Sequence, residues 1–276
     1  MRISSFRILL RYPFVCISPH PILNELCRDI CTGLHNDSFR GQKLIWVFCG
    51  AHKSFPIFRF LPGKHLYIQT EQLSDINGRR LWGIRNRNIV KNIKANLKKS
   101  HVFLDINTNN RDFYNHLDID ESDKLKIVVG PYIFPSLEVP FCPASERNKL
   151  IFFGSMNERR SRIINNISLK FSNEINVIPE KTYGKRLQTE IRNCSAVVNI
   201  HYDEGTYTEV PRVLSTYLKG KPIVSETLAE PFKKNIHYAN LNDLSERDDE
   251  AIFESLSQLV TTQLSFKSFI STYFAN

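Results

Sequence analysis

Polar and charged side chains gather where an apolar run meets a helical pattern, in the stretch NIHYDEGTYTEVPRVLSTYLKGKPIVSE (Asn199–Glu226). His201 ends the apolar run AVVNIH, which is typical of a central parallel strand. Glu209 opens the helical pattern that follows, and Arg212, three residues later, shares its helix face. Ser225–Glu226 end the next apolar run. Open α/β sheets bind ligands at the carboxyl ends of their strands, so this convergence predicts a site for hydroxyl and phosphate groups.

Each of these side chains also has a structural role open to it. Glu209 either complements the helix dipole or accepts hydrogen bonds from ribose hydroxyls. Arg212 either pairs with Glu209 or contributes to binding. His201 is either a histidine at a strand end whose hydrogen bonds are made within the fold, or a group that accepts or donates a proton in a reaction. The convergence of polar groups from consecutive strand ends is harder to explain by structure alone than any single residue.

A second group of polar residues lies in KLIFFGSMNERRSRIINNI, where a strand ends at Gly154–Ser155 and a helix begins near Asn157. Glycine lets the backbone turn tightly and lets a ligand approach. A helix N-terminus carries positive potential, which suits a pyrophosphate. Arg160 falls on the core-facing side of the first turn, so we expect it to reach toward the strand ends. The alternative is a plain helix start, capped by Ser155 or Asn157, with solvated arginines.

Apolar runs rich in β-branched and aromatic residues alternate with helical patterns along the chain, which predicts mostly parallel α/β sheets. In the first half, the predicted strands lie at 43–50, 64–71, 101–107 and 125–130, and the predicted helices at 21–34, 86–98 and 111–116. In the second half, the runs KLIFFGS, INVIP, SAVVNIH and KPIVSE are predicted strands. A helical pattern follows each of the first three.

The segment Gly130–Lys149 carries four prolines and no clear period, which predicts a linker. We therefore expect two Rossmann-like domains, residues 1–140 and 141–276, with mostly parallel sheets that face each other across a cleft. The tail Leu264–Asn276 has aromatic residues at helical spacing. It predicts a helix that packs back on the N-terminal domain, and a membrane-contact face is the alternative.

The chain of 276 residues has a formal net charge of +9, which points to anionic partners such as phosphorylated metabolites, nucleic acid or an acidic membrane surface. Its six cysteines lack CxxC or zinc-site spacing, so we expect buried free thiols and no metal. No run approaches the roughly 20 apolar residues of a membrane span. We predict a cytoplasmic protein, with peripheral contact at the inner face of the membrane left open.

The second half of the chain resembles the nucleotide-sugar-binding domain of GT-B glycosyltransferases. Glu209 at a helix start, followed by the small-residue turn in KGKPIVSE (Lys219–Glu226), is similar to a segment of many of those enzymes. Many of them carry a second glutamate seven residues earlier, where this chain has Tyr202. The blocks FFGSMNERR, NIH and EVPR are similar to those of bacterial glycosyltransferase-like proteins.

The resemblance implies roles for several residues. Gly154, Ser155 and Arg160 would face the diphosphate of a nucleotide-sugar, and Glu209 its ribose. Asn157, Arg212, Ser225 and Glu226 complete the expected donor site. The resemblance implies neither a metal nor a cofactor, because helix dipoles and basic side chains serve the diphosphate in such enzymes.

The first half would then bind the acceptor. YIQTEQLSD (Tyr67–Asp75) resembles an N-x-E-Q-L segment of the same proteins. Glu71 is either a general base for the acceptor hydroxyl or a carboxylate at a helix N-terminus. Glu71 or His201 would take the acceptor proton if the reaction inverts configuration. Three asparagines after the strand at 101–107 either bind sugar hydroxyls or make a turn: Asn107, Asn109 and Asn110.

The sequence therefore predicts a glycosyltransferase that moves a sugar from a nucleotide-sugar donor to a hydroxyl of a glycan or lipid-linked acceptor, as in cell-surface polysaccharide synthesis. One alternative is a basic α/β protein that binds nucleic acid or regulates, with the basic segment Gly78–Lys99 as its surface. The absence of helix-turn-helix, RRM and KH signatures disfavours nucleic acid. Another alternative is a non-catalytic homologue that binds a nucleotide-sugar.

Overall fold

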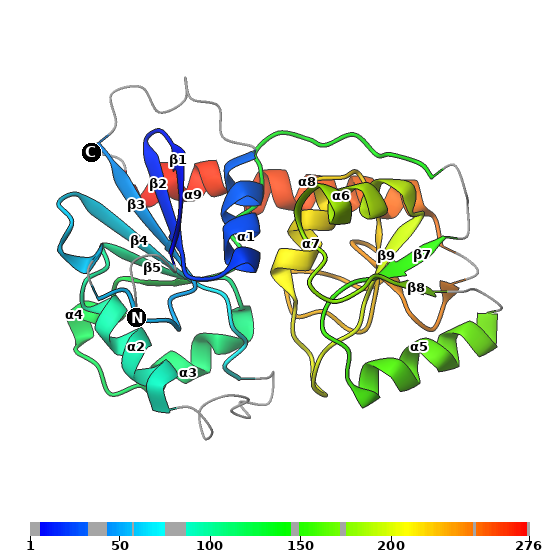
Figure 1. Cartoon of the computed structure of the whole chain (residues 1–276), viewed down its shortest axis with the longest axis horizontal. Coiled ribbons are helices and arrows are strands. Elements are labelled where there is room, and N and C mark those ends of the chain that lie inside the picture. The colour runs from blue at the N-terminus through cyan, green and yellow to red at the C-terminus, as the bar shows by residue number, and fades with distance from the viewer. Residues whose placement is uncertain are drawn as a thin grey trace. The chain divides into compact units, whose positions relative to one another are not determined.

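The computed structural model of the chain describes residues 6–32, 43–56, 58–74, 87–144, 149–171, 175–244 and 247–274. Residues 78–86 of the basic segment Gly78–Lys99 lie outside these ranges, as does Asp75. The chain divides into two units: unit 1 is Met1–Ser136 with Gln263–Asn276, and unit 2 is Leu137–Thr262. Each unit is a sheet with helices, so the predicted α/β class of two Rossmann-like units is confirmed (Figure 1).

Unit 1 is built on one six-stranded sheet in the order β1-β2-β3-β4-β5-β6. Its strands are β1 (Arg7–Arg11), β2 (Phe14–Ser18), β3 (Ile45–Cys49), β4 (Lys64–Gln69), β5 (Val102–Asp105) and β6 (Ile127–Val129). β1 and β2 form an antiparallel hairpin, and all other neighbours pair in parallel. The last four strands lie inside the predicted runs. The hairpin was not predicted, because Arg7 and Arg11 interrupt its apolar pattern.

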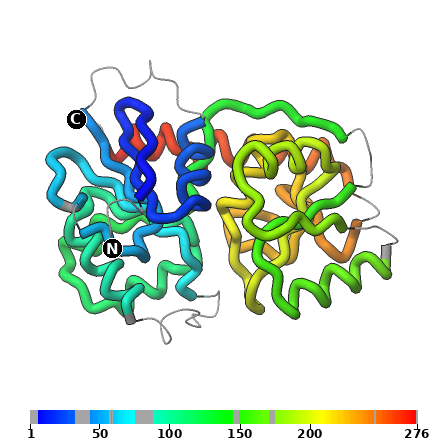
Figure 2. Tube along the Cα trace, in the orientation of Figure 1, coloured from blue at the N-terminus to red at the C-terminus, as the bar shows by residue number. Residues whose placement is uncertain are grey.

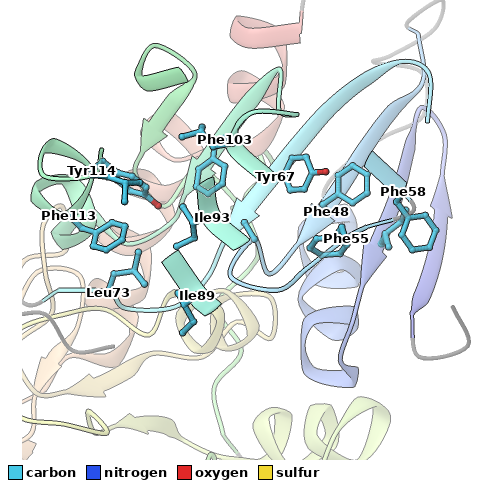
Figure 3. Close-up of a cluster of buried hydrophobic side chains, with 14 residues drawn as sticks. Phe48, Phe55, Phe58, Tyr67, Leu73, Ile89, Ile93, Phe103, Phe113 and Tyr114 are labelled. Atoms are coloured by element: carbon cyan, nitrogen blue, oxygen red, sulfur yellow. The ribbon is translucent and has the colours of Figure 1, made fainter. Parts of the chain in front are cut away.

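The helices of unit 1 are α1 (Pro21–Thr32), α2 (Arg87–Leu97), α3 (Arg111–Asn115), α4 (Glu121–Lys124) and α9 (Phe266–Phe274). Alternate residues of a strand point to opposite faces of the sheet. On one face, Phe48 and Tyr67 stack with ring centroids 4.4 Å apart and form a core with Ile89 and Ile93 of α2 (Figure 3). Phe14 of β2 meets the ring of Phe266, which places α9 with the strands of unit 1 (Figure 2).

Unit 2 is built on a five-stranded sheet in the order β11-β10-β9-β7-β8, parallel throughout. Its strands are β7 (Leu150–Phe152), β8 (Ile175–Val177), β9 (Ala196–Asn199), β10 (Ile223–Ser225) and β11 (Ala239–Asn240). The chain first moves from β7 outward to β8, then returns to β9 on the other side of β7. This reversal creates a topological switch point between β7 and β9, where doubly wound sheets bind their ligands.

Four helices cover this sheet: α5 (Glu158–Phe171), α6 (Gly184–Asn193), α7 (Val210–Tyr217) and α8 (Asp249–Gln263). Phe152 packs with Ile164 of α5, whereas its neighbour Ile151 packs with Ile191 of α6. Adjacent strand residues point to opposite faces, so α5 and α6 cover opposite faces of the sheet. Because β7 and β9 are parallel neighbours, the loops that follow them, which are the two loops of the switch point, lie at the same edge of the sheet.

The proline-rich segment is divided between the units. Phe134 pairs through its backbone with Ser265, within unit 1. In unit 2, the fully buried Lys221 donates to the carbonyl oxygen of Cys142 at 2.7 Å. The backbone passes close to the end of α7, because a Cβ on Gly220 would lie 2.3 Å from the carbonyl oxygen of Pro140. The boundary between the units falls at Ser136–Leu137 rather than at residue 140.

The prediction of buried free thiols is confirmed for five of the six cysteines. All six are free, and five are buried, but Cys142 is exposed. Within the described ranges, no group of three or more His, Cys, Asp or Glu side chains is arranged to hold a metal ion. In those same ranges, every helix is too short or too polar to cross a membrane.

Candidate functional site

The switch point of unit 2 is lined by the loop after β7 and the loop after β9. Gly154 makes the first turn with φ of +130°, a conformation that L side chains rarely adopt. A Cβ at this position would lie 2.6 Å from Nη2 of Arg212. The glycine is therefore needed both for the turn and for the space that the arginine occupies.

Arg160 joins the two loops. Its side chain is only 3% exposed, and its guanidinium donates from Nε to the Ile200 carbonyl at 2.9 Å and from Nη1 to the Ser155 carbonyl at 2.6 Å. Its Nη2 forms an ion pair with Glu209. The arginine thus reaches the ends of β7 and β9, as expected, and its cost of burial is offset by three partners.

Glu209 is the N-cap residue of α7, and its carboxylate pairs with both Arg160 and Arg212. Arg212 is 8% exposed and donates from Nη1 to Oδ1 of Asn199. Burial lowers the pKa of Arg212, and the charge of Glu209 opposes that shift. The Nε of Arg212 is buried without a hydrogen-bond partner. Two buried guanidinium groups therefore share one carboxylate, which leaves one excess positive charge among these three side chains.

A second ion pair lies beside the first. Glu226, just after β10, takes both Nη groups of Arg159. Its Oε2 also accepts the backbone N–H of His201 at 2.7 Å, and Arg159 donates to the His201 carbonyl at 2.9 Å. Pairing with Glu226 raises the pKa of Arg159. These contacts fix the loop after β9.

His201 itself is 1% exposed. Its Nε2 lies 2.9 Å from the Thr227 carbonyl, which accepts only from a protonated Nε2, and its ring lies 4.2 Å from that of Tyr207. Burial lowers the pKa of His201, so the ring is neutral near pH 7. In this conformation, the side chain fixes a loop and its Nδ1 is enclosed without a partner.

The remaining predicted residues of unit 2 also lie at this edge. Asn157 caps α5, because its Oδ1 accepts the backbone N–H of Arg160 at 2.9 Å, and its Nδ2 donates to the Tyr202 carbonyl at 2.7 Å. Ser155 is exposed. Ser225 is buried and accepts at Oγ from Nδ2 of Asn199 at 2.9 Å. Of the two N-caps considered from the sequence, the structure has Asn157.

A cavity of about 540 Å³ opens next to this network in unit 2. Glu226 and Thr227 line one side of it, at the carboxyl end of β10. Amide, hydroxyl and apolar side chains, one lysine and one glycine complete the wall: Ile163, Asn166, Ile167, Lys170, Gly205, Thr206, Asn240, Leu241 and Asn242. Its volume falls within the range of small-molecule sites.

The predicted base, Glu71, and the asparagines after β5 belong to unit 1, whereas His201 and the predicted donor-site residues belong to unit 2. Glu71 lies two residues after β4, with its side chain 35% exposed. Its carbonyl oxygen accepts from Nδ2 of Asn107 at 3.2 Å and of Asn110 at 2.9 Å. Asn110 also belongs to a 3-10 turn at Thr108–Asn110. Asn107 and Asn110 were predicted either to bind sugar hydroxyls or to form a turn. In the structure they take part in the turn and hold the loop that carries Glu71.

Three residues of these sites were not predicted to belong to them: Arg159, Asn199 and His52. Arg159 and Asn199 lie within the motifs FFGSMNERR and NIH. Their partners, Glu226 and Arg212, lie outside those motifs. His52 follows the predicted strand at 43–50, so its place at the carboxyl end of a strand was the available signal.

No family model matches the sequence, and comparison with curated proteins gives no match. Among solved structures, one similar chain is described as "Crystal structure of GtfA/B complex", with a TM-score of 0.40 and 8% sequence identity. The alignment covers 83% of this chain and 52% of the other, so this chain spans about half the length of the matched structure. A likeness at this TM-score carries no argument about activity.

Proposed function

We propose that the chain is a glycosyltransferase whose unit 2 binds the nucleotide diphosphate of a nucleotide-sugar donor. The excess positive charge at the switch point carries this proposal. Arg160 and Arg212 are both buried and share the single carboxylate of Glu209. A buried charge without a partner is costly, and a bound anion would supply the missing negative charge.

The position of this charge suits a diphosphate. Ligands of doubly wound sheets bind outside the carboxyl ends of the strands at the switch point, where both arginines lie. Gly154 has no side chain to hinder an approaching phosphate. The adjacent cavity, whose lining combines amides, hydroxyls, apolar side chains, Lys170 and Glu226, is large enough for a nucleoside or a sugar.

In the proposed reaction, the arginines stabilise the negative charge that develops on the leaving diphosphate. The sugar passes to a hydroxyl of a glycan or lipid-linked acceptor, and Glu71 in unit 1 accepts the hydroxyl proton. Cytoplasmic location and contact with the inner face of an acidic membrane remain part of this proposal. They rest on the resemblance and on the net charge of +9.

A ligand panel tests the donor site. We would measure thermal unfolding with UDP, GDP, CDP, ADP and CMP, each at ~100 times the dissociation constant, where a specific ligand adds about 2.7 kcal/mol. One nucleotide should stabilise the wild type, and Arg212→Gln should weaken that effect more than Arg192→Gln, a substitution at an exposed arginine of unit 2. Tyr202 has an exposed ring against the guanidinium of Arg160. Isothermal titration of the nucleotide into Tyr202→Ala and into the wild type gives a second comparison of binding.

Two results would count against this function. Stabilisation by none of the nucleotides would remove the donor-site proposal. Salt-dependent retention on DNA or RNA without any nucleotide effect would favour the nucleic-acid alternative, with a slope set by the number of phosphate contacts.

A further inference from the structure

A histidine and a glutamate meet at the carboxyl edge of the sheet in unit 1. His52 follows β3 and Glu71 follows β4, and these two strands are parallel neighbours. The Nε2 of His52 lies 3.4 Å from Oε1 of Glu71. The two residues are 19 positions apart, so the sheet, not local sequence, brings them together.

Asparagine side chains fix both loops that carry the pair. On α2, Asn92 donates to the His52 carbonyl at 3.0 Å, and Asn96 donates to the carbonyls on either side of it at 2.7 and 2.8 Å. On the other loop, Asn110 donates to the Glu71 carbonyl at 2.9 Å. Backbone carbonyls held in this way keep the distance between the two side chains defined.

The two side chains differ in exposure. His52 is 4% exposed and Glu71 is 35% exposed, so a buried imidazole supports a carboxylate that reaches solvent. The Nδ1 of His52 is buried without a hydrogen-bond partner. A buried N–H without an acceptor is costly, so the proton belongs on Nε2, which faces the Glu71 carboxylate at 3.4 Å.

Burial keeps this ring neutral. Burial, together with the charge of Lys53, lowers the pKa of His52 to about 4, against the opposing effect of a hydrogen bond with Gln69. Burial raises the pKa of Glu71, and Lys53 opposes that shift. Near pH 7, His52 is therefore an uncharged donor, and Glu71 is an anion that takes up a proton more readily than an ordinary glutamate.

We propose that His52 is a positioning residue that holds the Glu71 carboxylate as a proton acceptor through a neutral Nε2–H donor. The role of Glu71 rests on the proposed function. In that reaction, the acceptor oxygen forms a bond to the anomeric carbon and its proton moves to Glu71. The bond from that carbon to the phosphate oxygen breaks, and its electron pair leaves with the diphosphate.

Nuclear magnetic resonance tests the pair without any nucleotide. In the wild type labelled at histidine nitrogen and glutamate carboxyl carbon, we expect His52 to be neutral above pH 5, with its proton on Nε2. His52→Phe removes the donor, so the Glu71 titration should move to higher pH. His52→Gln retains an N–H donor and should restore part of the difference. His116→Phe, at an exposed histidine of the same unit, should leave Glu71 unchanged.

Either of two results would overturn the inference: a His52 proton on Nδ1, or a Glu71 titration that is the same in His52→Phe and the wild type. If His52→Phe fails to fold, the wild-type tautomer and the His52→Gln titration still decide. These readouts are independent of nucleotide binding. If no nucleotide stabilises the chain but the His52 and Glu71 titrations are as expected, only the donor-site proposal is removed. If a nucleotide stabilises the chain but those titrations are not as expected, only the role of His52 is removed.

Discussion

The guanidinium of Arg160 and the carboxylate of Glu209 form an ion pair that joins the first turn of α5 to the N-terminus of α7. The two residues are 49 positions apart. Since Arg212 contacts the same carboxylate, one negative charge serves two buried positive ones. The local stability of this edge therefore depends on these three side chains, and under the proposed function its affinity for anions depends on them as well.

Glu209→Gln should destabilise the chain by about 3 kcal/mol, because it leaves two buried guanidinium groups without a counter-charge. The free energy of unfolding in urea measures this effect. Glu204→Gln, at an exposed carboxylate of the neighbouring loop, is the matched control and should change it by less than about 0.5 kcal/mol. Equal effects of the two substitutions would show that the buried ion pairs add no more to the free energy of unfolding than an exposed carboxylate does.

Gly154→Ala should cost more than about 2 kcal/mol, because the backbone has φ of +130° and the new Cβ meets Arg212 at 2.6 Å. Gly184→Ala separates strain from collision. That residue also has positive φ, +61°, but a Cβ there meets nothing within 4 Å. We expect a cost of about 1 kcal/mol for Gly184→Ala. A Gly154→Ala protein as stable as Gly184→Ala would contradict the close approach of Arg212.

The carboxyl group of Asp105 should make stability fall as the pH rises. Burial raises its pKa from 3.8 to about 7, and hydrogen bonds from Tyr114, Asn107 and Asn110 oppose the shift. Between these values, the folded chain holds a proton that the unfolded chain has released. The stabilisation is therefore complete below pH 3.8 and lost as the pH rises through 7, by roughly 4 kcal/mol in total.

The difference in unfolding free energy between the wild type and Asp105→Asn isolates this group. We expect that difference to change steadily between pH 4 and 7 and to level off above pH 8. Asp118→Asn, at a fully exposed carboxylate, is the matched control. A flat difference for Asp105→Asn would show that its pKa is not raised.

Tyr217→Phe should destabilise unit 2 by about 1–2 kcal/mol. The buried hydroxyl lies 3.0 Å from Oγ of Ser257 on α8, and it accepts the backbone N–H of Val139 at 3.2 Å. Thermal unfolding measures the loss. Tyr273→Phe, at a half-exposed tyrosine of α9, removes the same atom and should have little effect. Indistinguishable melting temperatures for the two variants would mean that the Val139 contact adds no stability.

Local patterns in the sequence were sufficient for the elements and for short-range pairs. The spacing of Ile89, Ile93 and Leu97 is enough to indicate the buried face of α2, because residues four apart on a helix point the same way, and all three are buried. The same geometry predicted that Glu209 and Arg212 share a face, and they form an ion pair. Apolar runs located the strands that become β3 to β10, since each buried strand needs a continuous apolar segment.

The tertiary structure alone decided which distant groups meet. The strand order that creates the switch point between β7 and β9 depends on packing of the whole sheet, which no local pattern encodes. The pairs Arg160–Glu209 and Arg159–Glu226 in unit 2 and His52–Glu71 in unit 1 follow from the strand order of their own sheets, because parallel strands bring residues from separate loops to one edge. The sequence by itself determined that charged side chains stand at strand ends, whereas their partners, burial and shared positive charge arise only from the assembled sheets.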